Sequence, residues 1–285
     1  MLKENSEPRN RWARFTIGMT ACLLLASWVD ASSSTDDPFK TMAPADAAYI
    51  QKHLPGIVLG PVQDIPPLKN AEDWYPMKSL EFAYDRSVST DKEAMLVLEK
   101  IHRAPGTKIG EESEGWAVRL PNKTVRYLQS EEETGIVGPT DVSHAYGLII
   151  RLDPPEPIVH ANPKIGVPIE RDIGVKIYDL SDPTSVSYSG QVKCTWTDLG
   201  GWKVKVPMGT YDTHLIRIHY KGSIGPASVE SKRYMFMAKG VGPVAFTDSR
   251  DISAFFFYNN DSDHSGVLKE VTRMSSESGE AVGSN

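Results

Sequence analysis

Cysteine is scarce in this chain, with two among 285 residues. Two cysteines cannot build the disulfide framework of a small secreted domain. Basic residues are not in excess either, because 31 Lys+Arg stand against 37 Asp+Glu for a net charge of -6. That balance argues against a protein built to neutralise phosphates, so we expect no nucleic-acid partner. A charged fraction of 24% and a hydrophobic fraction of 40% are ordinary for a globular protein and exclude a wholly disordered chain.

Long hydrophobic runs are also missing beyond the N-terminal region. The uncharged run over residues 15–29 is about fifteen residues long, against about twenty for a membrane-spanning helix. It follows a basic N-terminal segment, and its last residue begins the tripeptide Val29-Asp30-Ala31, whose outer residues are small or short. The pattern predicts a signal peptide over residues 1–31, cleaved after Ala31, and therefore a periplasmic or secreted protein. An uncleaved membrane anchor is the main alternative, and lipidation at Cys22 is a third.

Motifs of catalysis and metal binding are absent as well. The sequence has no G-x-S-x-G, P-loop, C-x-x-C or H-E-x-x-H pattern, and residues 89–92 fit S-x-x-K without its companion motifs. His214 and His219 are five residues apart, which places them on opposite faces of a strand, so they cannot share a metal ion. Asp261 and Asp263 resemble part of a calcium loop that lacks its terminal glutamate. We therefore expect no enzyme, no metal site and no cofactor.

The first part of the predicted mature chain contains one helix signal. Alanines after Pro44 and the Pro-Gly stop after Leu54 predict a short helix over residues 44–54. Four prolines between residues 56 and 76 exclude a regular helix or central strand, so we expect an extended surface segment there. Residues 32–79 are thus predicted to hold the helix and a proline-rich segment.

Residues 80–274 have the alternation and turn spacing of antiparallel strands, and residues 275–285 have the composition of a disordered tail. The prolines at 154, 155 and 157 predict an extended connector, and the glycines at 200 and 201 predict a turn. Cys194 lies in one of these strands and is predicted to be a small core residue. The expected strands cover residues 80–84, 95–101, 116–120, 124–128, 146–152, 175–178, 187–196, 202–206, 215–221, 232–238, 243–246, 252–258 and 267–272. The fold class is therefore mainly β.

Some of these strands are apolar on both faces. Successive side chains of a strand point to opposite sides, so a strand with one wet face alternates apolar and polar residues. The segments 234–238, 252–258 and 148–150 do not alternate in this way. Exposing a Phe or Met side chain to water forfeits about 1.5–3 kcal/mol, so both faces of these strands must be covered.

Two kinds of cover are compatible with this pattern. A second layer of the protein, such as the helix at 44–54, can pack on the other face. Alternatively, the sheet is concave and its inner face holds a lipid or another apolar ligand, for which methionine is an adaptable lining residue. The candidate ligand-binding residues are Tyr234, Met235, Phe236, Met237, Phe255 and Phe257.

Two short motifs resemble a known family. Residues 205–212, KVPMGTYD, resemble the "VPAGTF" turn of many secreted bacterial proteins of unknown function, and residues 234–244, YMFMAKGVGPV, resemble their "YW.APGVGLV" segment. Those proteins are similar to the periplasmic lipoprotein-carrier (LolA/LolB-like) superfamily. The resemblance implies a curved antiparallel sheet or half-barrel with a short N-terminal helix, an envelope location, and lipid or lipoprotein handling.

The sequence therefore favours an exported, non-enzymatic envelope protein that binds an apolar ligand or a lipidated partner in a concave β-sheet. The expected partner is a lipid or a lipoprotein. The alternative is an envelope scaffold or protein-interaction module with a filled core, whose strand edges recruit another envelope protein.

Overall fold

The computed structural model describes residues 37–85, 93–101, 115–120, 123–254, 258–259 and 262–273. The predicted signal peptide, the S-x-x-K segment 89–92, Phe255, Phe257 and the predicted tail lie outside the described residues. The described elements are α1 (Pro44–His53), β1 (Val58–Val62), the 3-10 helix η1 (Ala71–Asp73), β2 (Leu80–Asp85), β3 (Glu93–Ile101), β4 (Gly115–Arg119), β5 (Thr124–Glu131), β6 (Gly135–Ser143), β7 (Leu148–Val159), β8 (Ile169–Asp179), β9 (Asp182–Val206), β10 (Gly209–Ile224), β11 (Ala227–Ala238), β12 (Gly242–Ala254), β13 (Tyr258–Asn259) and β14 (Ser262–Arg273).

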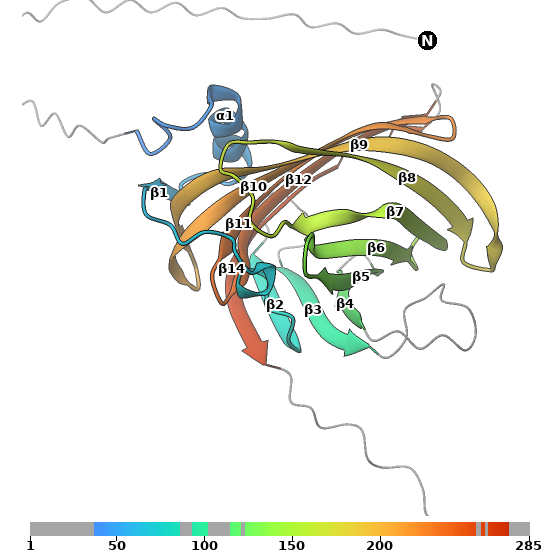
Figure 1. Cartoon of the computed structure of the whole chain (residues 1–285), viewed down its shortest axis with the longest axis horizontal. Coiled ribbons are helices and arrows are strands. Elements are labelled where there is room, and N and C mark those ends of the chain that lie inside the picture. The colour runs from blue at the N-terminus through green and yellow to red at the C-terminus, as the bar shows by residue number, and fades with distance from the viewer. Residues whose placement is uncertain are drawn as a thin grey trace, which may run out of the picture. The chain divides into compact units, whose positions relative to one another are not determined.

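All strands join one antiparallel sheet, as the sequence predicts, and this sheet curls strongly (Figure 1). The pairings run from β9 through β10, β11, β12 and β14 to β2, and then in chain order from β2 to β8. The ladder returns to its start, because β8 also pairs with β9. The sheet therefore has an inner and an outer face, with β4–β7 on the wall opposite β10–β12.

Cross-strand partners show which residues share the inner face. Cys194 on β9 pairs with Tyr220 on β10, and Tyr220 pairs with Ser231 on β11. Following the registers, Arg233 of β11 and Arg126 of β5 lie on the same face as Cys194. One large apolar cluster joins the inner-face residues with α1 and the strand residues that α1 covers, whereas Val142, Ile149 and Tyr178 form a separate small cluster on the outer face. Cys194 is fully buried in the large cluster, which confirms its prediction as a core residue.

Helix α1 begins and ends almost where the sequence predicts and packs on the outer face of β10 and β11. The Asp46 carboxylate accepts hydrogen bonds from Arg217 at 2.9 Å and from the Tyr234 hydroxyl at 2.7 Å. The Tyr49 ring stacks on the Tyr234 ring with 5.0 Å between centroids. The helix thus supplies the second layer over one face of β11. Neither helix in the described ranges is long and apolar enough to cross a membrane.

The proline-rich segment differs from its prediction as a surface segment. Val58–Val62 pairs with β9, and Leu68 and Trp74 are each only 1% exposed. The covering segment, residues 63–78, contacts opposite walls of the sheet: the Gly240 amide donates to the Asp73 carbonyl, and Ser130 donates to the Glu72 carboxylate. The prolines exclude a regular helix, but they do not prevent the apolar side chains between them from closing this end of the curled sheet.

Three predicted breaks in the strands are also wrong. The turn expected at Gly200 is a bulge within the continuous strand β9, where Gly200 has a φ of +86° and the register with β10 shifts. The proline connector 153–157 lies inside β7, which crosses it with irregular pairing to β6. Residues 243–246 and 252–254 belong to one strand, β12. Local turn signals do not exclude a bulged strand, because the extra residue stays unpaired while the ladder of hydrogen bonds continues on either side of it.

Candidate functional site

A group of charged side chains crosses the interior of the curled sheet. The charged cluster comprises Arg126 (β5), Asp141 (β6), Glu156 (β7), Tyr220 (β10), Arg233 (β11) and Asp248 (β12). These strands belong to two opposite walls. The cluster therefore links the walls through side chains, in a region where apolar packing is the usual solution.

Glu156 is the centre of the cluster. Its carboxylate lies 3.2 Å from Arg126 Nη2 and 3.0 Å from Arg233 Nη1, and it accepts a hydrogen bond from the Tyr220 hydroxyl. Arg126 also makes a bidentate contact with Asp141, with Nε–Oδ1 at 2.9 Å and Nη2–Oδ2 at 2.7 Å. Arg233 contacts Asp248 at 3.5 Å. Both guanidinium groups are thus held by carboxylates.

The electrostatics of the cluster follow from burial and pairing. Burial alone would lower the pKa of Arg126, but Asp141 and Glu156 outweigh it and raise that pKa well above its usual value. The pKa of Arg233 is also raised, because Asp248 and Glu156 outweigh burial. Burial and the Glu156 charge raise the pKa of the Tyr220 hydroxyl. The arginines therefore stay charged and Tyr220 stays neutral over the whole physiological range.

The pKa values of two further groups, Tyr75 and Cys194, are shifted by burial and by the charges of the cluster. Burial raises the pKa of Tyr75, in the covering segment, to about 12, although Arg126 and Arg233 oppose the shift. Burial and the Glu156 charge raise the pKa of the Cys194 thiol to about 12. A thiol with so high a pKa is a poor nucleophile, so Cys194 is chemically inert in this position.

Beyond the cluster, toward the β8–β9 hairpin, the inner face is apolar and only partly covered. The open inner face is formed by residues Leu148, Ile150, Leu152, Ile177, Tyr188, Ile224 and Val229. Six of them are half-buried, and Tyr188 is 53% exposed. Ile150, Leu152, Ile177 and Ile224 pack against the large apolar cluster and not against the small outer one. Solvent therefore reaches apolar side chains on the inner surface of the sheet.

On both β10 and β11, the inward-facing positions change in the same order from buried apolar residues to the charged cluster and then to half-buried apolar residues. Along β10, the inner positions run from buried Ile218 through Tyr220 to half-buried Ile224. Along β11, they run from buried Met235 through Arg233 to half-buried Val229. The interior thus has an apolar core next to the covering segment, a charged layer, and then the open inner face.

The predicted ligand-binding residues on β11 are all buried. Tyr234 and Phe236 face the side covered by α1, whereas Met235 faces inward at 7% exposure, and Met237 is fully buried. The prediction that this strand hides apolar side chains on both faces is confirmed. Their assignment to a ligand stays a prediction, as does that of Phe255 and Phe257, which lie outside the described residues.

The histidine pair is separated, as its spacing predicts. His214 is 1% exposed, with Nδ1 2.8 Å from Asp198 and Nε2 2.9 Å from the Pro66 carbonyl of the covering segment. His219 instead contacts Glu230 at 3.0 Å. Among the residues that the structure describes, no three His, Cys, Asp or Glu side chains are grouped to hold a metal ion.

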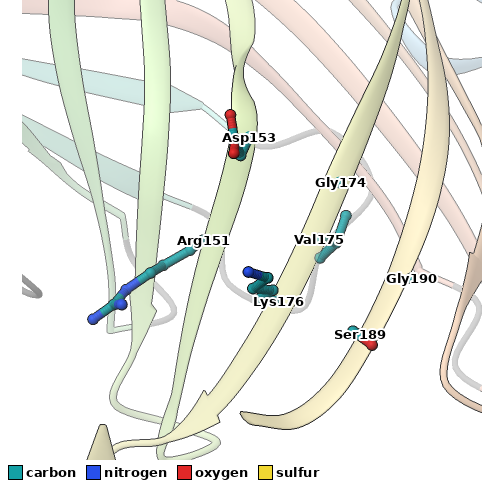
Figure 2. A pocket seen from close by; sticks show the side chains of 7 residues that line it. All are labelled: Arg151, Asp153, Gly174, Val175, Lys176, Ser189 and Gly190. Atoms are coloured by element: carbon teal, nitrogen blue, oxygen red, sulfur yellow. The ribbon is translucent and has the colours of Figure 1, made fainter. Parts of the chain in front are cut away.

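A shallow depression lies on the wall formed by β7, β8 and β9 (Figure 2). Its volume is about 160 Å³, and it is lined by Arg151, Asp153, Gly174, Val175, Lys176, Ser189 and Gly190. Arg151 lies 4.5 Å from the centroid of the Tyr178 ring, whose cluster marks the outer face. A volume of this size holds a few waters and is too small for a lipid chain.

Sequence reasoning missed the charged cluster and the open inner face. Arg126, Glu156 and Arg233 look like ordinary surface charges, and Glu156 lies in the predicted connector. One pattern in the sequence could have indicated the cluster: Arg233 is two residues from Met235, so both lie on the same face of the strand. That signal identifies a site only when the opposite wall is known.

No family model and no curated protein matches this chain. Two solved structures are similar to it. One is a "putative exported protein with YmcC-like fold" from Bacteroides fragilis NCTC 9343, with 11% sequence identity, coverage of 69% of this chain and 96% of that chain, and a TM-score of 0.35. The other is a "putative lipoprotein" from Parabacteroides distasonis ATCC 8503, with 11% identity, coverage of 74% and 100%, and a TM-score of 0.31.

Proposed function

We propose that the chain is an exported, non-enzymatic protein of the cell envelope that binds an apolar ligand or a lipid-bearing partner, in the manner of the lipoprotein carriers that its motifs resemble. The observation that carries the proposal is the open inner face. Ile177 and Ile224 are half-buried there, and Tyr188 is 53% exposed, although the strands curl around them. Covering such side chains stabilises a complex by about 25 cal/mol per Å² of apolar surface.

The N-terminal pattern supports the location. The basic segment, the apolar run of residues 15–29 and the tripeptide ending at Ala31 are typical of a signal peptide. In the envelope, acyl chains and lipid-modified proteins are the ligands that fit an apolar concave surface. The sequence contains no recognisable motif that pairs a nucleophilic side chain with a general base, which supports a binding role over a catalytic one.

Binding of the neutral dye Nile red to the purified mature protein tests this proposal. Ile177→Asp places a charge on the open inner face and should weaken dye binding at least tenfold. Leu59→Asp is the matched control, because Leu59 lies on β1 and is already 48% exposed. Dye binding that is absent, or equally strong in all three proteins, would contradict the proposal.

A second function is favoured by one observation. Residues 182–188 of β9 are all exposed and pair only with β8 among the described strands. Their second edge offers backbone donors and acceptors to an extended segment of another protein. A protein that carries no lipid on native mass spectrometry, binds no Nile red and yet forms a stable complex with an envelope protein would favour this scaffold function.

A further inference from the structure

We propose that the ligand of the open inner face is an amphiphile with an uncharged, hydrogen-bonding head group, and that the charged cluster excludes anionic head groups. This inference rests on the proposed function and specifies its ligand class. Along β10, the apolar position Ile224 is four positions from Tyr220 of the cluster. At the rise of a strand, that separation is about 13 Å, so an acyl chain that lies along the strands at Ile224 would bring one end to the cluster.

The cluster is accessible enough to meet a ligand. The side chains of Arg126 and Asp141 keep 14% and 15% of their surface exposed, and that of Arg233 keeps 13%. On the same face of β5 and β6, Thr124 and Ser143 place two hydroxyl groups 3.4 Å apart in the row next to that of Arg126. Ser143 pairs with Leu148 of the open inner face. A head group that reaches this level meets hydroxyl, carboxylate and guanidinium groups together.

The pairing within the cluster decides which head groups fit. An anionic head group needs a guanidinium that can turn toward it, but Arg126 is held by Asp141 and Glu156, and Arg233 by Glu156 and Asp248. Arg171 of β8, which pairs with Cys194 on the same face and donates to the Pro155 carbonyl at 3.4 Å, adds a third guanidinium group, so this layer holds as many guanidinium groups as carboxylates. A carboxylate or phosphate brought here would meet no excess of positive charge, and to reach Arg126 or Arg233 it would have to break an existing ion pair. A hydroxyl or amide head group can donate to the carboxylate oxygens without breaking any pair.

Competition between two ligands with the same acyl chain tests the inference. Nile red bound to the mature protein is displaced by 1-monooleoylglycerol or by oleate in detergent-free buffer at pH 7.5. We expect monooleoylglycerol to displace half the dye at a concentration at least tenfold below that of oleate. Equal potency, a preference for oleate, or displacement by neither ligand would overturn the head-group assignment while leaving an apolar binding face intact. Failure of Nile red to bind at all would instead overturn the proposed function, and the inference with it.

Two substitutions in the cluster test the mechanism of exclusion. Glu156→Gln removes the carboxylate shared by the two arginines and should shift the preference toward oleate at least fivefold. Asp248→Asn releases only Arg233 and should produce a smaller shift in the same direction, which keeps the test usable if the first variant does not fold. Asp212→Asn, which breaks the exposed pair with Lys203, is the control and should leave the preference unchanged. An unchanged preference in both cluster variants would overturn the proposed role of the cluster.

Discussion

Glu156 contacts three side chains, which come from opposite walls of the sheet. Arg126 belongs to β5, while Tyr220 and Arg233 belong to β10 and β11. Burying such a group of charges is costly, and it is tolerated only because each charge has a partner at close distance. Removing one member is therefore far more harmful than its own contacts imply, since the remaining charges stay buried.

We expect Glu156→Ala to lower the free energy of unfolding by about 3–5 kcal/mol, because Arg126 and Arg233 lose their shared partner. Urea denaturation followed by tryptophan fluorescence measures this change. The control is Asp212→Ala, which removes an ion pair that is about half exposed and should cost less than about 1 kcal/mol. Similar losses in the two variants would show that the cluster carries no special energy.

His160 predicts a pH dependence of stability. Burial, and secondarily the nearby Arg171 charge, lower the pKa of His160 to about 4. Its unfolded pKa is about 6.5, so below that pH the unfolded chain binds more protons than the native protein. The contribution of neutral His160 is thus fully present above pH 6.5 and is lost as the pH falls toward 4.

We expect this loss to be about 2 kcal/mol between pH 6.5 and pH 4. Denaturation of wild type and His160→Phe across this range measures it. The Phe side chain keeps the edge contact with Trp196, whose ring lies 4.9 Å from that of His160, but it cannot take up a proton. Parallel curves for the two proteins would contradict the assignment to His160.

At the scale of elements, two inward-facing glycines allow β9 and β10 to coil closely. Gly190 and Gly222 lie on adjacent strands near the open inner face. A Cβ atom at Gly190 would lie 2.0 Å from the Ser223 carbonyl oxygen, and one at Gly222 would lie 2.2 Å from that of Gln191. These are backbone contacts that no side-chain rotation relieves. The close coiling helps β9 to bend far enough to pair with both β8 and β10.

Gly222→Ala should therefore lower stability by about 1–3 kcal/mol, the usual cost of overpacking. Gly138→Ala on β6 is the matched control, because its Cβ would meet only ordinary contacts, the nearest being the Tyr127 carbonyl oxygen at 3.6 Å. We expect the control to change stability by less than about 0.5 kcal/mol. Differential scanning calorimetry of both variants distinguishes them, and equal midpoints would contradict the packing argument.

At the scale of the whole molecule, the sheet is joined by a pairing between segments far apart in sequence. β14 lies between β12 and β2, so Val267 pairs with Asp85 and Leu268 pairs with Tyr84. This pairing connects the first strands of the sheet to the last. Without it, β12 and β2 would each present an unpaired edge, which is a site for aggregation.

A chain that ends at residue 261 should consequently aggregate or fail to fold, because it lacks β14. A chain that ends at Arg273 keeps every strand that the structure describes and should match the full mature chain in thermal midpoint. Size-exclusion chromatography and circular dichroism compare the two. A soluble, cooperatively folded product of the shorter chain would show that the β14 pairing is dispensable.

The sequence alone determined the class of the fold and most of its elements. Strand alternation, the helix signal at Pro44 and the turn at Met208 depend on neighbours within a few residues, so they are readable from the chain. The apolar character of both faces of residues 234–238 also follows from the sequence of neighbouring residues. Parity even predicts that His214 and His219 point in opposite directions.

Only the tertiary structure decided what lies opposite each face. The covering segment is buried, β9 passes through its predicted turn, and Glu156 meets Arg233 although 77 residues separate them. Such contacts depend on how far the sheet curls and in which register its distant strands pair. Those quantities arise from many weak terms summed over the whole chain, so no local pattern encodes them.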